Sequence, residues 1–253
     1  MDLQLSGLNA IVTGGSKGIG RAVVQALLGE GANVAFCARN AQGVAQLESE
    51  FSGLGPKVLG SVVDVADRIA LEAWVHNSAQ ALGGIDIVVC NVSALALDDT
   101  EESWQANLSV DLMHTVRTCK AAIAYLEKSA NASIVNISSA SALELDGAMG
   151  PYSTTKAAII AYTAYLSTSL AGKNIRANTV SPGNTYVKGG ILNRIEVEDP
   201  EGFAGILASN PTGRMGTPEE AAFAVLTLSS PRASRISGTN FVVDGALTRS
   251  VQF

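Results

Sequence analysis

Short, continuous runs of apolar residues recur along the chain and alternate with longer stretches of helical length. Each run is apolar throughout and does not alternate with polar residues, which is typical of parallel strands covered by helices on both faces. We therefore predict seven strands, at Asn9–Thr13, Asn33–Cys37, Val58–Val62, Asp86–Cys90, Ser133–Ser138, Arg176–Val180 and Thr239–Val243.

The stretches between these runs carry helix start and stop signals. Asn40 and Asp67 are candidate N-caps, and Thr217 precedes a Pro and two Glu residues, as at many helix starts. We expect helices over Gly18–Gly29, Asn40–Gly53, Asp67–Gly83, Glu101–Lys128, Pro151–Gly172 and Thr217–Ser229. The repeated strand–helix order predicts an α/β fold, a single doubly wound parallel sheet (Rossmann-type) of about seven strands with helices on both faces.

One segment, Gly183–Gly216, has weak periodicity and is rich in Gly, Asn and Pro. A stretch of this length without a strong pattern is usually a functional loop. The chain shows no internal repeat and no Pro-rich linker. We therefore expect one domain over residues 1–253, with a substrate lid at about residues 184–216.

Composition and charge exclude several classes of protein. The chain has 17 basic and 23 acidic residues, a net charge of −6 and only 5% aromatic residues, so it suits neither a phosphate backbone nor base stacking. No apolar run approaches the ~20 residues of a membrane span, and the N-terminus lacks the basic region of a signal peptide. Cys37, Cys90 and Cys119 form no C-x-x-C and are expected as buried free thiols. We expect a cytoplasmic protein that binds neither nucleic acid nor a membrane.

A glycine-rich segment joins the first expected strand to the first expected helix, with the sequence Thr13-Gly14-Gly15-Ser16-Lys17-Gly18-Ile19-Gly20. Gly14 allows a tight turn, Gly18 lets the backbone approach a pyrophosphate, and Gly20 permits close packing of helix and strand. The N-terminus of the helix then offers free N–H groups to the anion. A glycine-rich turn without a ligand is the alternative.

Tyr152 and Lys156 lie four residues apart, so on a helix they share one face, about 5–6 Å apart at Cβ. A free phenol has a pKa of about 10, and a neighbouring ammonium favours the phenolate, which makes the phenol a usable proton donor and acceptor. A chance pairing is the alternative. Ser139 follows the fifth strand thirteen residues before Tyr152, and a Ser at the end of a strand is often an ordinary turn residue.

The spacings T-G-x3-G-x-G, Ser139 and Y-x3-K resemble those of the short-chain dehydrogenase/reductase family, and the resemblance covers nearly the whole chain. It implies that Tyr152 exchanges a proton with the substrate oxygen and that Ser139 orients this oxygen. It also implies that Lys156 lowers the pKa of Tyr152 and holds the ribose of the cofactor. The cofactor-binding residues implied by the resemblance are Gly14, Ser16, Lys17, Gly18, Ile19, Gly20, Arg39, Asp64, Val65, Asn91, Tyr152, Lys156, Pro182 and Gly183.

The end of the second strand bears on the choice of cofactor. Family members that use NAD carry an acidic residue where this chain has Ala38, and Arg39 comes next. A guanidinium suits a 2′-phosphate bidentately, and Lys17 adds a second positive charge nearby. We therefore expect NADP(H) to be preferred, with NAD(H) possible, although Arg39 could instead be a solvated surface residue.

Two positions depart from the family. Ser93 stands where the family has a Gly after the fourth strand, and Asp111 stands where its fourth catalytic residue, an Asn, is usual. An Asn donates and accepts, whereas an ionised Asp only accepts. Asp111 could pair with Lys156 and still hold a water, or it could sequester Lys156; we favour a working substitute that acts in the proton relay. His76 and His114 have no partner at triad or metal-ligand spacing, so both are expected at a helix surface or in packing, and no metal is expected.

We expect an oxidoreductase that transfers a hydride between NADP(H) and a ketone or secondary alcohol. Its expected contacts with a small-molecule substrate come from Ser139, Ser141, Leu143, Asn184 and Tyr186. Because family members are commonly tetramers, the resemblance also implies a homotetramer or homodimer, paired through Glu101–Lys128 and Pro151–Gly172.

Two other functions stay open. One is a dinucleotide-binding sensor or scaffold with weak or no turnover, which Asp111 and the altered segment Asn91–Ser93 keep possible. The other is a 3-oxoacyl thioester reductase acting on an acyl carrier. Such a carrier is acidic and needs a basic patch at the cleft, and Lys188, Arg194 and Arg214 are too scattered to form one.

Overall fold

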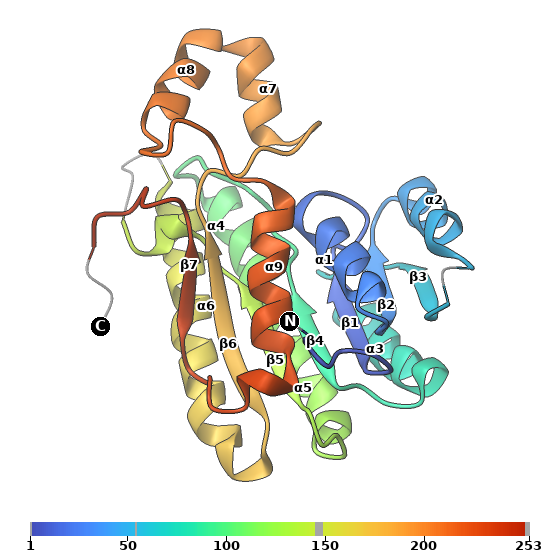
Figure 1. Cartoon of the computed structure of the whole chain (residues 1–253). Coiled ribbons are helices and arrows are strands. Elements are labelled where there is room, and N and C mark those ends of the chain that lie inside the picture. The colour runs from blue at the N-terminus through green and yellow to red at the C-terminus, as the bar shows by residue number, and fades with distance from the viewer. Residues whose placement is uncertain (1, 54, 145–148, 251–253) are drawn as a thin grey trace.

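The computed structural model describes residues 2–53, 55–144 and 149–250 and has a central parallel sheet covered by helices on both faces (Figure 1). The strands run in the order β3-β2-β1-β4-β5-β6-β7 across the sheet. Their bounds are β1 Asn9–Thr13, β2 Asn33–Ala38, β3 Val58–Val62, β4 Ile87–Cys90, β5 Ser133–Ile137, β6 Arg176–Pro182 and β7 Asn240–Val243. The predicted fold class and the seven predicted strands are confirmed, with strand ends that differ by at most two residues.

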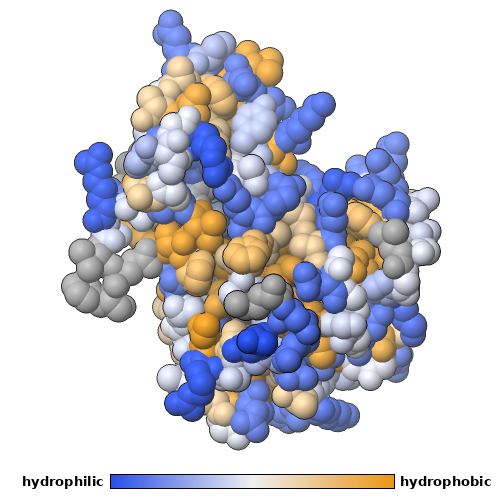
Figure 2. Space-filling view, in the orientation of Figure 1, coloured by the Kyte–Doolittle hydropathy of each residue, from blue (hydrophilic) through white to orange (hydrophobic). Residues whose placement is uncertain are grey.

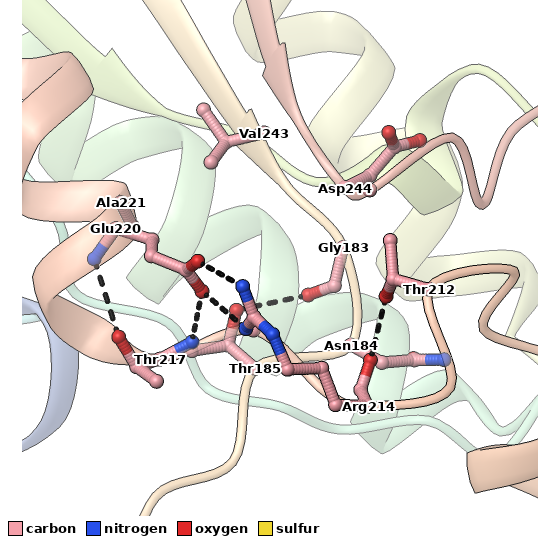
Figure 3. A pocket seen from close by; sticks show the side chains of 12 residues that line it. Gly183, Asn184, Thr185, Thr212, Arg214, Thr217, Glu220, Ala221, Val243 and Asp244 are labelled. Carbon is pink, nitrogen blue, oxygen red and sulfur yellow. Dashed lines mark hydrogen bonds and ion pairs between the residues drawn. The ribbon is translucent and has the colours of Figure 1, made fainter.

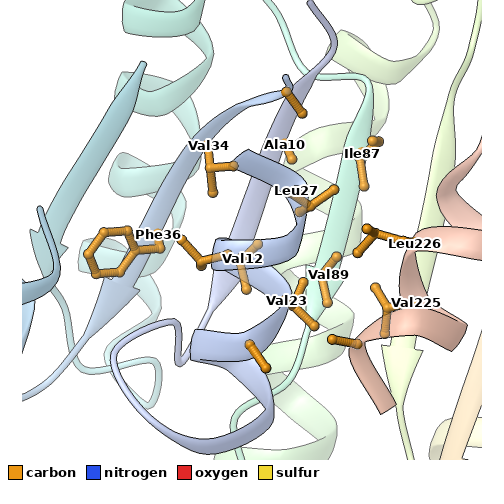
Figure 4. Packing of buried hydrophobic residues seen from close by; sticks show 14 of the residues in the cluster. Ala10, Val12, Val23, Leu27, Val34, Phe36, Ile87, Val89, Val225 and Leu226 are labelled. Carbon is orange, nitrogen blue, oxygen red and sulfur yellow. The ribbon is translucent and has the colours of Figure 1, made fainter. Parts of the chain in front are cut away.

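Two helical layers bury the sheet. The helices on one face are α1 (Gly18–Gly29), α2 (Ala41–Phe51) and α9 (Pro218–Ser229). On the other face lie α3 (Arg68–Leu82), α5 (His114–Leu126) and α6 (Gly150–Leu170). Figure 4 shows the first face, where aliphatic side chains of α1 and α9 pack against β1 and β4. Because the central strands are buried on both sides, their continuous apolar runs follow directly from the fold.

The caps predicted from the sequence are present. Asn40 Oδ1 accepts a hydrogen bond from the N–H of Gly43 at the start of α2, and Asp67 caps α3 in the same way. Thr217 and Glu220 form a reciprocal capping box at the start of α9. These short polar side chains satisfy backbone N–H groups that the first helical turn leaves without partners.

The predicted helix Glu101–Lys128 is not a regular α-helix. It consists of α4 (Glu101–Asn107), a π-helical turn η1 (Leu108–Met113) and α5. A π turn inserts one extra residue into the helical repeat and rotates the side chains that follow, and such turns are frequent at functional sites.

The lid has more regular structure than its sequence pattern predicts. It contains α7 (Ile191–Glu198) and α8 (Pro200–Ala208), which stand at one end of the sheet (Figure 1). Both helices are short and have no fully buried side chain, so their apolar positions form only a weak periodic pattern. Three 3₁₀ turns complete the described structure: η2 (Ala140–Ala142), η3 (Ala171–Lys173) and η4 (Pro231–Ala233).

The order of the strands locates the site. The chain builds outward from β1 to β3 and then returns to place β4 on the other side of β1. Ligands of such sheets bind in the crevice beyond the carboxyl ends of the strands where this order reverses. The three cysteines are free and buried, as predicted. Within the described ranges, no helix is both long and apolar enough to cross a membrane.

Candidate active site

The glycine segment after β1 forms a cradle that tolerates no side chain at its key positions. A Cβ added to Gly20 would lie 2.2 Å from the carbonyl oxygen of Gly14, and one added to Gly14 would lie 2.9 Å from Val92 Cγ2. Gly14 and Gly18 also have φ values of 70° and 55°, which favour glycine. Since Lys17 at the N-cap of α1 gives no side-chain cap, the first N–H groups of this helix face an anion site, which fits a pyrophosphate.

The adenosine end of the crevice has positive charge and no acid at the end of β2. Ala38 ends the strand and Arg39 follows it, and both Arg39 and Lys17, the N-cap of α1, are exposed. Neither cation has an ion-pair partner among the residues that the structure describes. Ser16 lies next to the start of α2, because a Cβ at Gly43 would be 3.6 Å from Ser16 Cβ. These groups suit a phosphate on the ribose.

Asp64 and Val65 follow β3 at the same edge of the sheet. Asp64 is exposed, and its Oδ1 accepts from the N–H of Ala66 at 3.0 Å, so one carboxylate oxygen caps the turn and the other remains accessible. Val65 is buried in the core beneath this turn. The accessible oxygen fits the cofactor-binding role that the resemblance implies for Asp64, and the bond to Ala66 is that of an ordinary turn residue.

Asn91 fixes the cradle to β4. Its backbone N–H donates to Thr13 Oγ1 at 2.9 Å, and its Nδ2 donates to the carbonyl oxygens of Thr13 at 3.1 Å and Gly14 at 3.4 Å. Gly183 follows β6 and packs closely on the residue that follows β7, since a Cβ added to Gly183 would lie 2.7 Å from Asp244 Cβ. Asn91 and the segment Pro182–Gly183 therefore lie at the carboxyl ends of β4 and β6, the edge of the sheet at which the resemblance implies cofactor binding.

Tyr152 and Lys156 lie on α6, which packs against the end of β5 and against η2, where Ser139 is the N-cap. Lys156 is only 2% exposed, and its Nζ lies 5.6 Å from the centre of the Tyr152 ring and 3.2 Å from the carbonyl oxygen of Ile137, to which it donates. Ser138 Oγ donates to the carbonyl oxygen of Lys156 at 2.8 Å and so ties the strand end to the helix. Ser139 is nearly buried, and its Oγ accepts from the N–H of Ser141, which leaves its own hydrogen free to be donated.

Asp111 completes this group from the π turn. Its Oδ1 lies 3.1 Å from Lys156 Nζ, and the two side chains are 0% and 2% exposed. The contact is one of opposite charges at short range rather than a well-aligned hydrogen bond. The other carboxylate oxygen accepts from the N–H of Ala94 at 2.8 Å. The predicted pairing of Asp111 with Lys156 is thus present, whereas nothing in the sequence pointed to the π turn that creates it.

His114 has a place that the sequence did not reveal. It is buried, as one of the two expectations for it allowed, with Nδ1 at 2.6 Å from the carbonyl oxygen of Val110 and Nε2 at 3.0 Å from Thr13 Oγ1. Burial lowers the pKa of His114 from 6.5 to about 4, outweighing the favourable field of Asp111. The neutral ring therefore links α5 to the foot of the cradle. Because Thr13 and His114 are more than a hundred residues apart in the chain, no local sequence pattern predicts their contact.

The predicted substrate residues divide between two regions. Ser141 and Leu143 lie on and just after η2, next to Ser139. Asn184 lines a cavity of about 90 Å³ together with Arg214, Glu220 and Asp244 (Figure 3). Tyr186 lines a larger cavity of about 360 Å³ between the lid helices and residues 213–217.

The lid is held mainly by its own polar contacts. The hydroxyl of Tyr186 donates to Glu196, Asn193 Nδ2 donates to the hydroxyl of Tyr186 at 2.9 Å, and the ring of Phe203 packs edge-on against that of Tyr186. The hydrogen bond to Glu196 raises the pKa of Tyr186. Tyr186 thus anchors the lid, with one side of its ring toward the cavity.

Arg214 and Glu220 form an ion pair that joins the end of the lid to the start of α9. Arg214 makes two hydrogen bonds to the carboxylate, at 3.0 Å and 2.6 Å (Figure 3). These bonds and the capping contact of Thr217 lower the pKa of Glu220 to about 2. Arg214 is therefore neutralised and is not a free positive charge at the cleft. Over residues 2–53, 55–144 and 149–250, no group of three or more His, Cys, Asp and Glu side chains could hold a metal ion.

Known proteins are similar to this chain over nearly its whole length. Residues 14–248 match the family model described as enoyl-(acyl carrier protein) reductase. An isoepoxydon dehydrogenase of Penicillium expansum is 36% identical over 98% of this chain and 98% of its own. A 3-oxoacyl-[acyl-carrier-protein] reductase of Chlamydia pneumoniae is 34% identical over 98% of this chain and all of its own.

Among solved structures, L-sorbose reductase of Gluconobacter frateurii, complexed with NADPH and L-sorbose, is similar with a TM-score of 0.92. It is 27% identical, and the match covers 99% of this chain and 100% of that one. The chain belongs to the short-chain dehydrogenase/reductase family. It is an NAD(P)-dependent oxidoreductase that acts on CH–OH and C=O groups.

Proposed function

We propose that this protein is an NADP(H)-preferring oxidoreductase that interconverts a small-molecule ketone and its secondary alcohol. The observation that carries the proposal is the buried Lys156 ammonium beside the Tyr152 ring on α6, a helix that packs against the 3₁₀ turn η2, at which Ser139 is the N-cap. The glycine cradle next to this group fits the dinucleotide, which supplies or accepts the hydride when bound.

The side chains have distinct roles in this proposal. In the direction of reduction, the Tyr152 hydroxyl gives its proton to the substrate oxygen, and in oxidation the phenolate takes the proton back. Ser139 donates its free hydrogen to the same oxygen and so fixes its position. The Lys156 ammonium stabilises the phenolate electrostatically. Cradle residues from Gly14 to Gly20, together with Asn91 and Gly183, hold the dinucleotide.

The experiment is a turnover assay with NADPH and NADH against a panel of ketones that range from aliphatic to cyclic and hydroxylated. We expect consumption of NADPH with at least one class of ketone and formation of the matching alcohol. Binding of NADPH without turnover of any ketone would instead support the dinucleotide-binding alternative, against which the family membership argues.

The preference for NADP(H) is supported by Ala38, Arg39 and Lys17, because no acid opposes a 2′-phosphate and two cations lack partners in the described part of the chain. Arg39→Ala should raise KM for NADPH by about 10- to 100-fold, since a charge-assisted hydrogen bond contributes roughly 1.5–3 kcal/mol, and should leave KM for NADH unchanged. Arg235→Ala, an exposed arginine elsewhere, is the matched control.

A carrier-bound thioester is the second candidate substrate, since one relative is a 3-oxoacyl-[acyl-carrier-protein] reductase. The charges of the lid argue against a carrier-bound substrate. Residues 184–216 contain three basic and four acidic side chains, and Arg214 is already paired with Glu220. An acidic carrier would meet no positive patch there. Comparing kcat/KM for a carrier-bound acetoacetyl group with that for a free ketone tests this, and we expect the free ketone to be the better substrate.

We also propose that the protein is a homotetramer or homodimer. Tyr165 on α6 and Leu108 and Met113 on η1 are exposed apolar side chains on the helices predicted to pair. A second such surface contains Phe223 on α9 and Phe241 on the edge strand β7, which are 68% and 42% exposed, and Figure 2 shows hydrophobic surface on that face. Sedimentation analysis of the wild type and of Phe223→Asp tests this, and a wild-type monomer would contradict the proposal.

A further inference from the structure

The segment that follows β4 is clamped to the helix opposite by two buried side chains. Asn107 Nδ2 donates to the carbonyl oxygen of Ala96 at 2.7 Å, and Asp111 Oδ2 accepts from the N–H of Ala94 at 2.8 Å. Asn107 and Asp111 are both 0% exposed. The segment is therefore held in one position against α4 and η1, right beside Lys156.

A tight turn in this segment aims the N–H of Ala94 at Asp111. Ser93 Oγ accepts from the N–H of Leu95 at 3.1 Å, and Leu95 has a φ of 50°, in the left-handed region that a Leu side chain rarely adopts. The strain at Leu95 is maintained by the contacts on both sides of it. Ser93 and Asp111 are the two positions at which the chain departs from the family pattern. The peptide group between Ser93 and Ala94 connects them, because its N–H donates to Asp111.

Position 111 therefore faces two hydrogen-bond donors, the N–H of Ala94 and the ammonium of Lys156. The carboxylate presents an oxygen to each, since Oδ2 accepts from the N–H of Ala94 and Oδ1 lies 3.1 Å from the ammonium as its counter-charge. An Asn of the same shape has a single accepting oxygen, and its NH₂ group would face a donor in either orientation. A buried donor left without an acceptor costs about 1–3 kcal/mol.

We propose that Asp111 is a positioning residue whose carboxylate this chain requires, because it holds Lys156 and the Ser93–Leu95 turn together. Ser93 and Asp111 then compensate for one another, so the Asn found elsewhere in the family is not an equivalent residue here. The inference rests on the proposed function, since Asp111 acts on turnover only through Lys156 and Tyr152.

The first test is a double-mutant cycle. Asp111→Asn should lower kcat by about tenfold or more, with KM for NADPH changed less, because the ammonium loses its fixed place beside Tyr152. Ser93→Gly should lower kcat by about threefold or less. In the double variant the freed turn can rotate the N–H of Ala94 away from position 111. The kcat of the double variant should therefore be higher than the value obtained by multiplying the fold-reductions of the two single variants. Asp98→Asn, an exposed acid on the same segment, is the matched control and should match the wild type.

The second test needs no turnover. Hydrogen exchange of the Ala94 amide, followed by NMR, should be slow in the wild type and faster in Ser93→Gly. These two proteins can be measured even if Asp111→Asn does not fold. Fast exchange of this amide in the wild type would overturn the inference. So would an Asp111→Asn enzyme with wild-type kcat, or strictly multiplicative effects in the cycle. If the wild type turns over no ketone while the Ala94 amide is protected, the proposed function is wrong. The structural part of the inference, that Asp111 holds the Ser93–Leu95 turn, is then still supported.

Discussion

The proposed catalytic floor, formed by Ser139, Tyr152, Lys156 and Asp111, differs from the proposed lid, residues 184–216, in how it is held. In the floor, Lys156 and Asp111 are buried and contact the end of β5, the start of α6 and the π turn. In the lid, α7 and α8 bury no side chain fully, and the contacts of Tyr186 remain within the lid. The sheet therefore determines the geometry of the chemistry, whereas the lid can change its shape with few consequences for the rest of the chain.

The largest effect should come from the proton donor in the floor. Tyr152→Phe removes the hydroxyl and keeps the ring beside Lys156, so kcat should fall by roughly 10²–10⁴ while the dissociation constant for NADPH changes little. Tyr165→Phe, on the exposed side of the same helix, is the control and should keep normal activity. A Tyr152→Phe enzyme with a tenth or more of the wild-type kcat would remove Tyr152 from the proposed reaction.

The buried pair should dominate stability. Lys156→Met leaves the Asp111 carboxylate buried without a counter-charge, which should cost about 3–5 kcal/mol of unfolding free energy in urea titrations. Adding Asp111→Asn should recover part of this loss. Lys173→Met breaks an exposed pair with Glu127 and should cost less than about 1 kcal/mol. Equal losses for the two lysine variants would contradict the contrast between a buried floor and a solvated surface.

Acid should weaken the floor through His114. Its pKa is about 4 in the folded protein and 6.5 as a free side chain, so below pH 6.5 the unfolded chain binds a proton that the folded chain does not. Stability is then complete above pH 6.5 and falls towards pH 4 by up to roughly 3 kcal/mol. The pH dependence of the urea midpoint should be shallower in His114→Gln than in the wild type. Identical slopes would mean that this ring does not contribute.

The smallest effect should come from the lid. Tyr186→Phe removes the hydrogen bonds to Glu196 and Asn193 and keeps the ring in the cavity. KM for the ketone should rise by up to about tenfold, and the unfolding free energy should change by only about 0.5 kcal/mol. A large loss of stability in this variant would show that the lid is part of the core structure.

The sequence predicted the parts of the molecule that repeat a simple pattern. The strands were evident because burial on both faces keeps them apolar, and the helix caps at Asn40, Asp67 and Thr217 have local signatures. The spacing of Ser139, Tyr152 and Lys156 was informative because two of them share one helix face. Except for Ser139, which stands thirteen residues before Tyr152, these signals lie within a few residues along the chain.

What could not be predicted depends on contacts between distant segments. The π turn around Asp111 leaves no local signature, because residues 101–126 are helical on either side of it. The bond between His114 and Thr13 joins residues 101 positions apart. In the lid, the helices are too short and too exposed for a periodic pattern, so the orientation of Tyr186 follows from its partners and not from its neighbours in sequence.

The hydrogen bonds from Thr13 Oγ1 to His114, and from Asn91 to Thr13, have a consequence for folding kinetics. They join the strand at which the chain starts its sheet to a helix that follows β4, and the Lys156–Asp111 pair then joins that helix to the second half of the sheet. Contacts of such long sequence separation form late, after loop closure has been achieved. The cofactor cradle and the catalytic floor should thus mature together as the last step of refolding, so that the return of NADPH binding reports the completed sheet and not the first helices.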